Sequence, residues 1–254
     1  MKILWINPIG TMAFDADTTK ILSEIKREET TIKVVSLPSN RPLHLEYHSY
    51  EAMVVADIVR ITYKAANQYD AIVIGCFYDV GLREAREVSG TSMVVAPCQS
   101  ATAIASNLGN SFSILVGRAK WIPKMRENVY LYGHGHRLAS MRSVDLGVHD
   151  FQADIARTSE RLIREGRKAI EEDGAEVIIL GCTGEYGFYK IMQDTLGVPV
   201  IDAMLAPFKY AEFMVELKDK IGWLPSRKGG SEPPPSSETD LWRIFEDSPV
   251  DLYD

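Results

Sequence analysis

The sequence lacks the features that tie a protein to a membrane or to nucleic acid. No apolar run approaches the roughly 20 residues that span a bilayer, and the apolar start at residues 3–6 breaks at Asn7-Pro8, short of a secretory signal. Lysine and arginine form no long cluster and the formal net charge is −7, so a phosphate backbone meets no basic surface. We therefore expect a cytoplasmic protein that binds neither membranes nor nucleic acid.

Cysteine is also scarce. There are three, Cys76, Cys98 and Cys182, and an odd number in a reducing compartment argues against a disulfide framework. The other proportions, 46% hydrophobic and 25% charged residues, are those of an ordinary globular protein. A chain of 254 residues can form one large domain or two of about 100 residues each.

Apolar runs alternate with amphipathic segments along the chain, which predicts an α/β fold with a mostly parallel sheet. We expect strands at residues 2–6, 32–37, 71–74, 92–96, 111–116, 177–180 and 199–201. We expect helices from residue 15 and at residues 49–67, 82–88, 101–108, 121–131, 151–172, 185–196 and 206–220. In the helix at 49–67, Met53, Ala56, Ile58 and Ile61 fall roughly on one face.

One motif occurs twice, at residues 72–81 and 178–187. Each copy is an apolar run ending in Gly-Cys, followed by an acidic residue three places on and a glycine two places after that. The pairs at this 106-residue offset are Gly75 and Gly181, Cys76 and Cys182, Asp79 and Glu185, and Gly81 and Gly187.

A repeat of this length favours two related lobes. We expect two pseudo-twofold-related α/β lobes, each a mostly parallel sheet flanked by helices, with the active site in the cleft between them. The first lobe is assigned to residues 1–96 and 206–222, and the second to residues 97–205. Residues 223–254 are rich in Pro, Gly, Ser and acidic residues, which predicts an extended, partly disordered tail.

Cys76 and Cys182 are the candidate catalytic residues. Each follows the carboxyl end of an expected strand, where open α/β sheets bind ligands, and a helix starting directly behind it would favour the thiolate. Two thiols on opposite sides of a carbon can invert it, because one removes a proton and the other returns one. The alternative is two small buried hydrophobes, which the matched settings disfavour. Cys98 pairs with Met204 in the repeat and is interpreted as structural or site-lining.

Two further features stay open or weak. Asp79 and Glu185 are equally well explained as capping groups and as paired acids that support the cysteines. His134 and His136 form a His-x-His pair between glycines without an acidic or cysteine partner nearby, so a solvated turn is preferred and no metal site is expected.

Four segments carry a family resemblance. They are Gly-Cys-Phe-x-Asp-x-Gly-Leu at 75–82, Gly-Cys-Thr-Gly at 181–184, Ile6-Asn7-Pro8 and Trp121-Ile122-Pro123. Together they resemble the aspartate/glutamate/hydantoin racemase superfamily, and within it the hydantoin and allantoin racemase branch. The resemblance runs from residue 1 to about residue 235.

The resemblance implies two α/β lobes, a homo-oligomer and a two-base mechanism without a cofactor. Carried over by position, Cys76 and Cys182 are the bases, and the residues that line the substrate pocket are Asn7, Phe77, Thr183 and Gly184. The chain departs from the family pattern at Tyr78, at Val80 and at Cys98-Gln99. Gln99 is kept as a substrate-binding candidate, and these departures affect the substrate more than the reaction.

We therefore expect a racemase that acts on a small molecule at a carbon next to a carbonyl, most simply a 5-substituted hydantoin or allantoin. Such a proton is acidic enough for thiolates to remove without pyridoxal or metal. The alternatives are an aspartate or glutamate racemase, a related isomerase or decarboxylase, and a non-catalytic binder of small molecules on the same fold.

Overall fold

The computed structural model describes residues 1–252, so the last two residues of the expected tail lie outside the described part. The chain divides into two compact units. The first comprises residues 1–75, 80–96 and 208 onward, and the second comprises residues 76–79 and 97–207. Residues 76–79, which include Cys76, thus belong to the same unit as Cys182.

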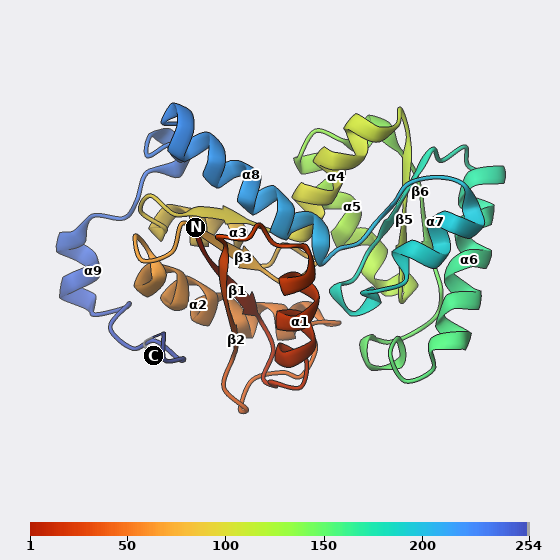
Figure 1. Cartoon of the computed structure of the whole chain (residues 1–254). Coiled ribbons are helices and arrows are strands. Elements are labelled where there is room, and N and C mark those ends of the chain that lie inside the picture. The colour runs from red at the N-terminus through yellow and green to blue at the C-terminus, as the bar shows by residue number, and fades with distance from the viewer. Residues whose placement is uncertain (253–254) are drawn as a thin grey trace. The chain divides into compact units, whose positions relative to one another are not determined.

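Each unit contains one four-stranded parallel sheet flanked by helices, which confirms the expected fold class (Figure 1). The strands are β1 (Lys2–Asn7), β2 (Thr31–Ser36), β3 (Ala71–Ile74), β4 (Met93–Val95), β5 (Phe112–Val116), β6 (Leu138–Ser143), β7 (Val177–Leu180) and β8 (Val200–Ile201). The helices are α1 (Asp15–Ile25), α2 (His48–Ala65), α3 (Leu82–Val88), α4 (Pro97–Leu108), α5 (Ile122–Leu131), α6 (Ile155–Glu171), α7 (Tyr189–Leu196), α8 (Leu205–Ile221) and α9 (Ser236–Trp242).

The two sheets have the same topology. Their strand orders are β2-β1-β3-β4 and β6-β5-β7-β8. In each sheet the second strand is added on one side of the first, and the later strands are added on the other side. The strand order therefore switches between β1 and β3 in one unit and between β5 and β7 in the other. At such a switch point the connecting helices leave to opposite faces and open a crevice at the carboxyl ends of the strands. β3 and β7, at residues 71–74 and 177–180, are related by the 106-residue offset of the repeated motif.

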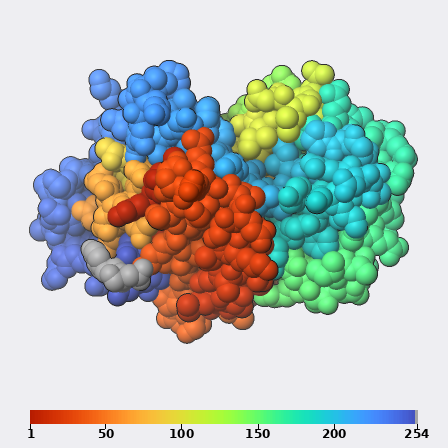
Figure 2. All heavy atoms as spheres, in the orientation of Figure 1, coloured from red at the N-terminus to blue at the C-terminus, as the bar shows by residue number. Residues whose placement is uncertain are grey.

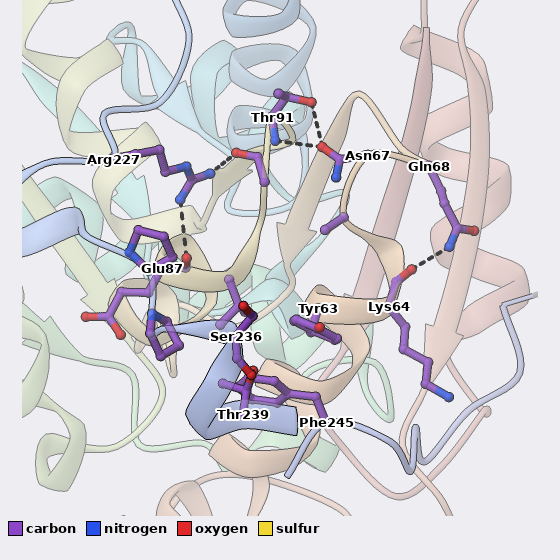
Figure 3. A pocket seen from close by; sticks show the side chains of 15 residues that line it. Tyr63, Lys64, Asn67, Gln68, Glu87, Thr91, Arg227, Ser236, Thr239 and Phe245 are labelled. Carbon is purple, nitrogen blue, oxygen red and sulfur yellow. Dashed lines mark hydrogen bonds between the residues drawn. The ribbon is translucent and has the colours of Figure 1, made fainter. Parts of the chain in front are cut away.

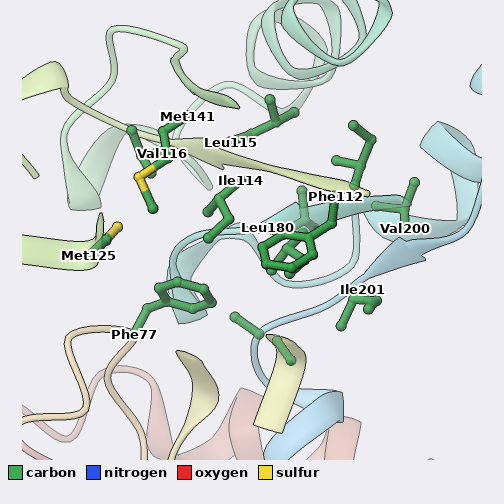
Figure 4. Packing of buried hydrophobic residues seen from close by; sticks show 14 of the residues in the cluster. Phe77, Phe112, Ile114, Leu115, Val116, Met125, Met141, Leu180, Val200 and Ile201 are labelled. Carbon is green, nitrogen blue, oxygen red and sulfur yellow. The ribbon is translucent and has the colours of Figure 1, made fainter. Parts of the chain in front are cut away.

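The interior strands β1, β3, β5 and β7 are buried along nearly their whole length, as expected for parallel strands covered on both faces. In the second unit their side chains form one cluster around Phe112, Ile114 and Leu180 (Figure 4). The edge strand β6 is mostly half-exposed. Its residues, Leu-Ala-Ser-Met-Arg-Ser, include no apolar run, so the strand was not predicted.

Helices α2 and α4 differ from expectation, one in its buried face and the other in its start. On α2 the buried residues include Val54, Ile58 and Ile61, whereas Met53 and Ala56 are exposed, so the predicted face was rotated. α4 begins at Pro97 instead of residue 101. Proline is favoured in the first turn of a helix because it has no N–H to leave unpaired. Cys98 and Gln99 therefore lie in a helical turn and not in a loop.

The C-terminal segment packs on the first unit. Phe245 stacks on Tyr63 of α2 with ring centroids 4.5 Å apart, and Arg60 Nε donates to the Ile244 carbonyl at 3.2 Å. In the space-filling view the segment, in dark blue, lies against the orange atoms of α2 (Figure 2). The composition of residues 223–254 predicts an extended arm, and the mostly apolar residues 241–245 were expected to be able to dock on a neighbouring surface. The helix that they contact could not be predicted, because aromatic contacts with a distant helix leave no local pattern.

Arg227 anchors the start of this segment. Its guanidinium donates to the backbone carbonyls of Arg86 and Gly90 and, at 2.9 Å, to Ser89 Oγ. Figure 3 shows Arg227 beside Glu87, whose carbonyl it also reaches at 3.4 Å. The segment, α2 and the α3–β4 turn together line an open pocket of ≈ 890 Å³. None of the residues predicted for the active site lines this pocket.

Within residues 1–252, no helix combines the length and the apolar character needed to cross a bilayer.

Replacing Arg227 by alanine should release the C-terminal segment, because hydrogen bonds from a charged donor contribute about 1.5–3 kcal/mol each. Limited proteolysis should then cut residues 223–235 at least tenfold faster than in the wild type. Arg243→Ala removes the same charge from an exposed site paired with Glu246, and should leave the rate unchanged. Equal cleavage in both variants would contradict the anchor.

Candidate functional site

Both cysteines follow a glycine that leaves no room for a side chain. A Cβ on Gly181 would lie 2.5 Å from the Leu115 carbonyl oxygen, and one on Gly75 would lie 2.6 Å from Trp5 Nε1. Each glycine still makes one hydrogen bond of the sheet: Gly75 N–H donates to the Ile6 carbonyl, and Gly181 N–H donates to the Leu115 carbonyl. The glycine allows the chain to leave the sheet immediately before the cysteine.

The three thiols have different surroundings. Cys76 and Cys182 are half-buried at the carboxyl ends of β3 and β7, whereas Cys98 is fully buried. Burial, aided by the negative charge of Asp79, raises the pKa of Cys98 well above its usual value. Cys98 therefore stays a thiol, as the structural interpretation of this residue requires, and only Cys76 and Cys182 are partly exposed to solvent.

The repeated motif was expected to place a helix directly behind each cysteine, and here the prediction was wrong. α3 begins at Leu82 and α7 at Tyr189, so a loop follows each cysteine, with a short 3-10 turn at Thr183–Glu185 in the second. Gly81 and Gly187, which close the two loops, have φ of +67° and +86°. This left-handed backbone favours glycine and explains the last position of the motif.

A backbone amide takes the place of the expected helix end at Cys182. Gly184 N–H donates to Cys182 Sγ at 3.4 Å. The loop is held by Gln152, whose Nε2 donates to the carbonyls of Gly184 and Tyr186 at 3.0 and 3.2 Å. The Phe151 ring also lies 3.3 Å from the point that a Cβ on Gly184 would occupy. An N–H donor favours the charged form of the sulfur it faces.

The Cys76 loop is held by Asp79. Its carboxylate accepts the backbone N–H groups of Cys98 and Gln99 at 2.8 and 2.9 Å, and the phenol of Tyr132 at 2.8 Å. Its own N–H donates to the Cys76 carbonyl at 2.9 Å. Asp79 is thus a capping residue, but it caps α4, which follows its loop after α3 and β4. Capping had been expected only in the turn that follows the cysteine.

The corresponding cap in the second half is Asp202. Its carboxylate accepts the N–H groups of Met204 and Leu205, at the start of α8, at 2.7 and 3.3 Å. It also accepts the N–H of Gly187, in the Cys182 loop, at 3.1 Å. Each cysteine loop is therefore joined to a helix N-terminus by one carboxylate.

Glu185, the repeat partner of Asp79, caps nothing. It is fully buried, and neither carboxyl oxygen makes a hydrogen bond to another described residue. Burial raises its pKa well above the usual value, and the nearby charge of Asp202 acts in the same direction. Of the two roles that the sequence left open, Asp79 takes the cap, and Glu185 is a buried acid within the Cys182 loop.

Asn7 ends β1 beside Gly75 of the motif. Its Oδ1 accepts from Trp5 Nε1 at 2.7 Å, and its Nδ2 donates to Asp15 at 2.6 Å. Ser36 donates to the same Asp15 oxygen at 2.6 Å. The residue is 7% exposed, and the orientation of its side chain is fixed by both of these partners.

The other predicted pocket residues differ in exposure. The Phe77 ring is 2% exposed and points into the core of the second unit among the β5 side chains (Figure 4). Thr183, Gly184 and Gln99 are half-buried, and the Gln99 backbone is bound by Asp79. Their contact with a substrate stays a prediction.

Several residues that shape the loops were missed by the sequence reasoning. Asn128 donates to the Tyr78 carbonyl at 2.7 Å, and Tyr132 and Gln152 make the contacts given above. None of these side chains has a local signal, because each acts on a loop at least 32 residues away. Asp202 did have one: an aspartate between an apolar strand and a helix is a common N-cap.

Asp79→Asn should destabilise the protein by about 1–3 kcal/mol, because the amide group turns one donor toward an N–H that needs an acceptor. Denaturant unfolding gives the change in free energy. Tyr132→Phe removes one of the three bonds and keeps the cap, so its loss should be smaller. An Asp79→Asn protein as stable as the wild type would show that the cap does not hold the loop.

Comparisons with known proteins identify the family of the chain. The sequence pattern of the family described as Asp/Glu/Hydantoin racemase matches residues 3–211. A hydantoin racemase of Pseudomonas sp. (strain NS671) is 35% identical over 229 residues, which cover 90% of this chain and 91% of the relative. One from Rhizobium meliloti is 34% identical over 216 residues, covering 85% and 89%.

A solved structure of an allantoin racemase from Klebsiella pneumoniae superposes with a TM-score of 0.84 at 26% identity, covering 93% of this chain and 94% of that one. The agreement in sequence and in fold extends over nearly the whole chain. The protein therefore belongs to the Asp/Glu/hydantoin racemase family, and it is an isomerase that acts as a racemase.

Proposed function

We propose that this racemase inverts the C5 carbon of a 5-substituted hydantoin or of allantoin, with Cys76 and Cys182 as its two bases. The observation that carries the proposal is the matched placement of the two thiols. Each is half-buried and follows a glycine at the carboxyl end of the strand beside the sheet's switch point, while the third thiol is buried and stays protonated.

In the proposed reaction one cysteine, as thiolate, takes the proton from C5, and the electron pair of that C–H bond moves into the adjacent C4 carbonyl. The resulting enolate then takes a proton on its opposite face from the other cysteine, which enters the step as a thiol. Each turnover exchanges the protonation states of the two sulfurs, so the enzyme is ready for the other enantiomer.

The loop geometry supports these roles. The Gly184 N–H that faces Cys182 Sγ stabilises the thiolate, which is the nucleophilic and basic form. Asp79 fixes the Cys76 loop through the first turn of α4. Loops fixed by these contacts limit the motion of the two sulfurs. This matters because proton transfer requires the base to lie within hydrogen-bond reach of the proton.

The class of substrate is inferred from the relatives, which are hydantoin racemases in sequence and allantoin racemases in structure. Both substrates are five-membered cyclic ureides with a proton next to a carbonyl. Asn7, Gln99, Thr183 and Gly184 are proposed to contact the ring. Phe77 is kept as a proposed contact, and only 2% of the residue is exposed.

Incubation of each enantiomer of a 5-substituted hydantoin in heavy water should give loss of optical rotation together with deuterium at C5. The panel should include allantoin, aspartate and glutamate, since an amino-acid racemase would label the acids instead. If no member of the panel exchanges its proton or loses rotation, the proposed substrate class is wrong.

Cys76→Ser and Cys182→Ser should each lower the rate of racemisation by about 10²–10⁴-fold, the usual contribution of a general acid or base. The matched control is Cys98→Ala, which removes the buried thiol. Its rate of racemisation should stay within about threefold of the wild type, because Cys98 has no proposed role in proton transfer. Polarimetry gives the rates. Unchanged racemisation in either serine variant would contradict the two-base assignment.

A further inference from the structure

The two halves of the molecule cap equivalent helices with carboxylates from different places. At the 106-residue offset, the α4 amides of Cys98 and Gln99 correspond to the α8 amides of Met204 and Leu205. The first pair is capped by Asp79 of the cysteine loop and the second by Asp202 from the helix side.

Because Asp202 caps the second helix, Glu185 does not have the capping role of its repeat partner Asp79. The repeat partner of Asp202 is Ala96, so only the second half carries an acid at both positions. Asp202 fills the cap, and Glu185 stays in the Cys182 loop with 0% of its surface exposed. The backbone N–H groups of Cys182 and Gly181 lower the pKa of its carboxyl and so oppose the effect of burial, although neither carboxyl oxygen accepts a full hydrogen bond.

The protonation of this pair of acids follows from their partners. Burial raises the pKa of Asp202, but its carboxylate also accepts three N–H groups, from Gly187, Met204 and Leu205, which favour the charged form and oppose that rise. Glu185 accepts no full hydrogen bond, and burial disfavours the charged form of an unpaired carboxylate. With a like charge beside it, Glu185 is the acid that keeps its proton.

Other titratable groups near the loop do not alter this balance. Those on the neighbouring elements are His149 and Asp150 before α6 and Lys190 on α7, which are exposed to solvent, and the half-buried Tyr186 and Tyr189. The charge that acts on Glu185 is that of Asp202. The group in the same loop that changes its charge in the proposed mechanism is Cys182.

We propose that Glu185 is held as a neutral carboxylic acid within the Cys182 loop, and that its neutrality makes it a positioning residue that lets the neighbouring thiolate form. This role rests on the proposed function of Cys182 as a base. A carboxylate in the same loop would oppose the thiolate by like-charge repulsion. The first loop avoids the problem differently, because the Asp79 carboxylate is bound by two helix amides and a phenol.

The neutral acid can be tested through stability alone. Burial raises the pKa of Glu185 in the folded state, so the folded protein holds a proton that the unfolded chain releases above about pH 4.5. Its contribution to stability is complete below that pH and is lost as the pH rises toward the folded-state pKa. Glu185→Gln removes this dependence and keeps the shape of the side chain.

The unfolding equilibrium constant of the wild type, divided by that of Glu185→Gln, should therefore rise by up to tenfold per pH unit above about pH 4.5. The control is Glu171→Gln on α6, where the carboxyl is exposed and pairs only loosely with Arg167 at 4.0 Å, so its ratio should stay nearly flat. A flat ratio for Glu185→Gln as well would overturn the proposal.

If Glu185→Gln does not fold, the wild-type protein still gives an answer. With ¹³C at the carboxyl carbon of its glutamates, one resonance should keep the chemical shift of a protonated acid at neutral pH. This labelling excludes Asp202. A spectrum in which every glutamate is ionised would overturn the proposal.

The link to Cys182 is tested by alkylation in a Cys76→Ser background, where Cys98 is buried and protected. The pH midpoint of the reaction of Cys182 with iodoacetamide should be the same whether or not Glu185→Gln is also present. An acidic shift of the midpoint on adding Glu185→Gln would show that Glu185 is charged when the thiolate forms, and would overturn its role. None of these measurements uses a racemase substrate, so their failure is distinct from failure of the proposed function.

Discussion

The carboxylate bridge between a cysteine loop and a helix N-terminus is the interaction on which the site depends. A helix begins with N–H groups that have no partner within the helix, and a carboxylate both pairs them and complements their partial charge. Asp79 extends from the Cys76 loop to α4, whereas Asp202 extends from the start of α8 to the Cys182 loop. Because Asp202 supplies the second cap, the acidic position of the second motif is released from that role, and Glu185 occupies it as a buried, neutral group.

Close packing under the cysteines imposes a second constraint. Gly181 lies against the Leu115 carbonyl and Gly75 against the Trp5 indole, so any side chain at these positions would displace the strand end or the ring. Trp5 in turn donates to Asn7, which places the indole between the sheet, the glycine and a predicted substrate contact. Each cysteine loop is therefore supported by a sheet at its start and by a helix N-terminus further along.

Local patterns in the sequence were enough to predict the fold class and the strands that carry the cysteines. β3 and β7 were predicted to the residue, because interior parallel strands are apolar throughout and both of these end at a glycine. The repeated Gly-Cys motif likewise identified the two candidate bases. Edge strand β6 was missed, since a half-exposed strand has no such run.

The role of each acid, in contrast, depends on the folded chain. Asp79 and Glu185 are alike in sequence, but the partners that separate them lie elsewhere: the amides of α4 are 19 residues from Asp79, and Asp202 is 17 residues from Glu185. The contacts of Asn128, Tyr132 and Gln152 span even longer separations. Periodicity and spacing report a residue's local conformation, whereas its hydrogen-bond partners and burial depend on segments that meet only after the chain has folded.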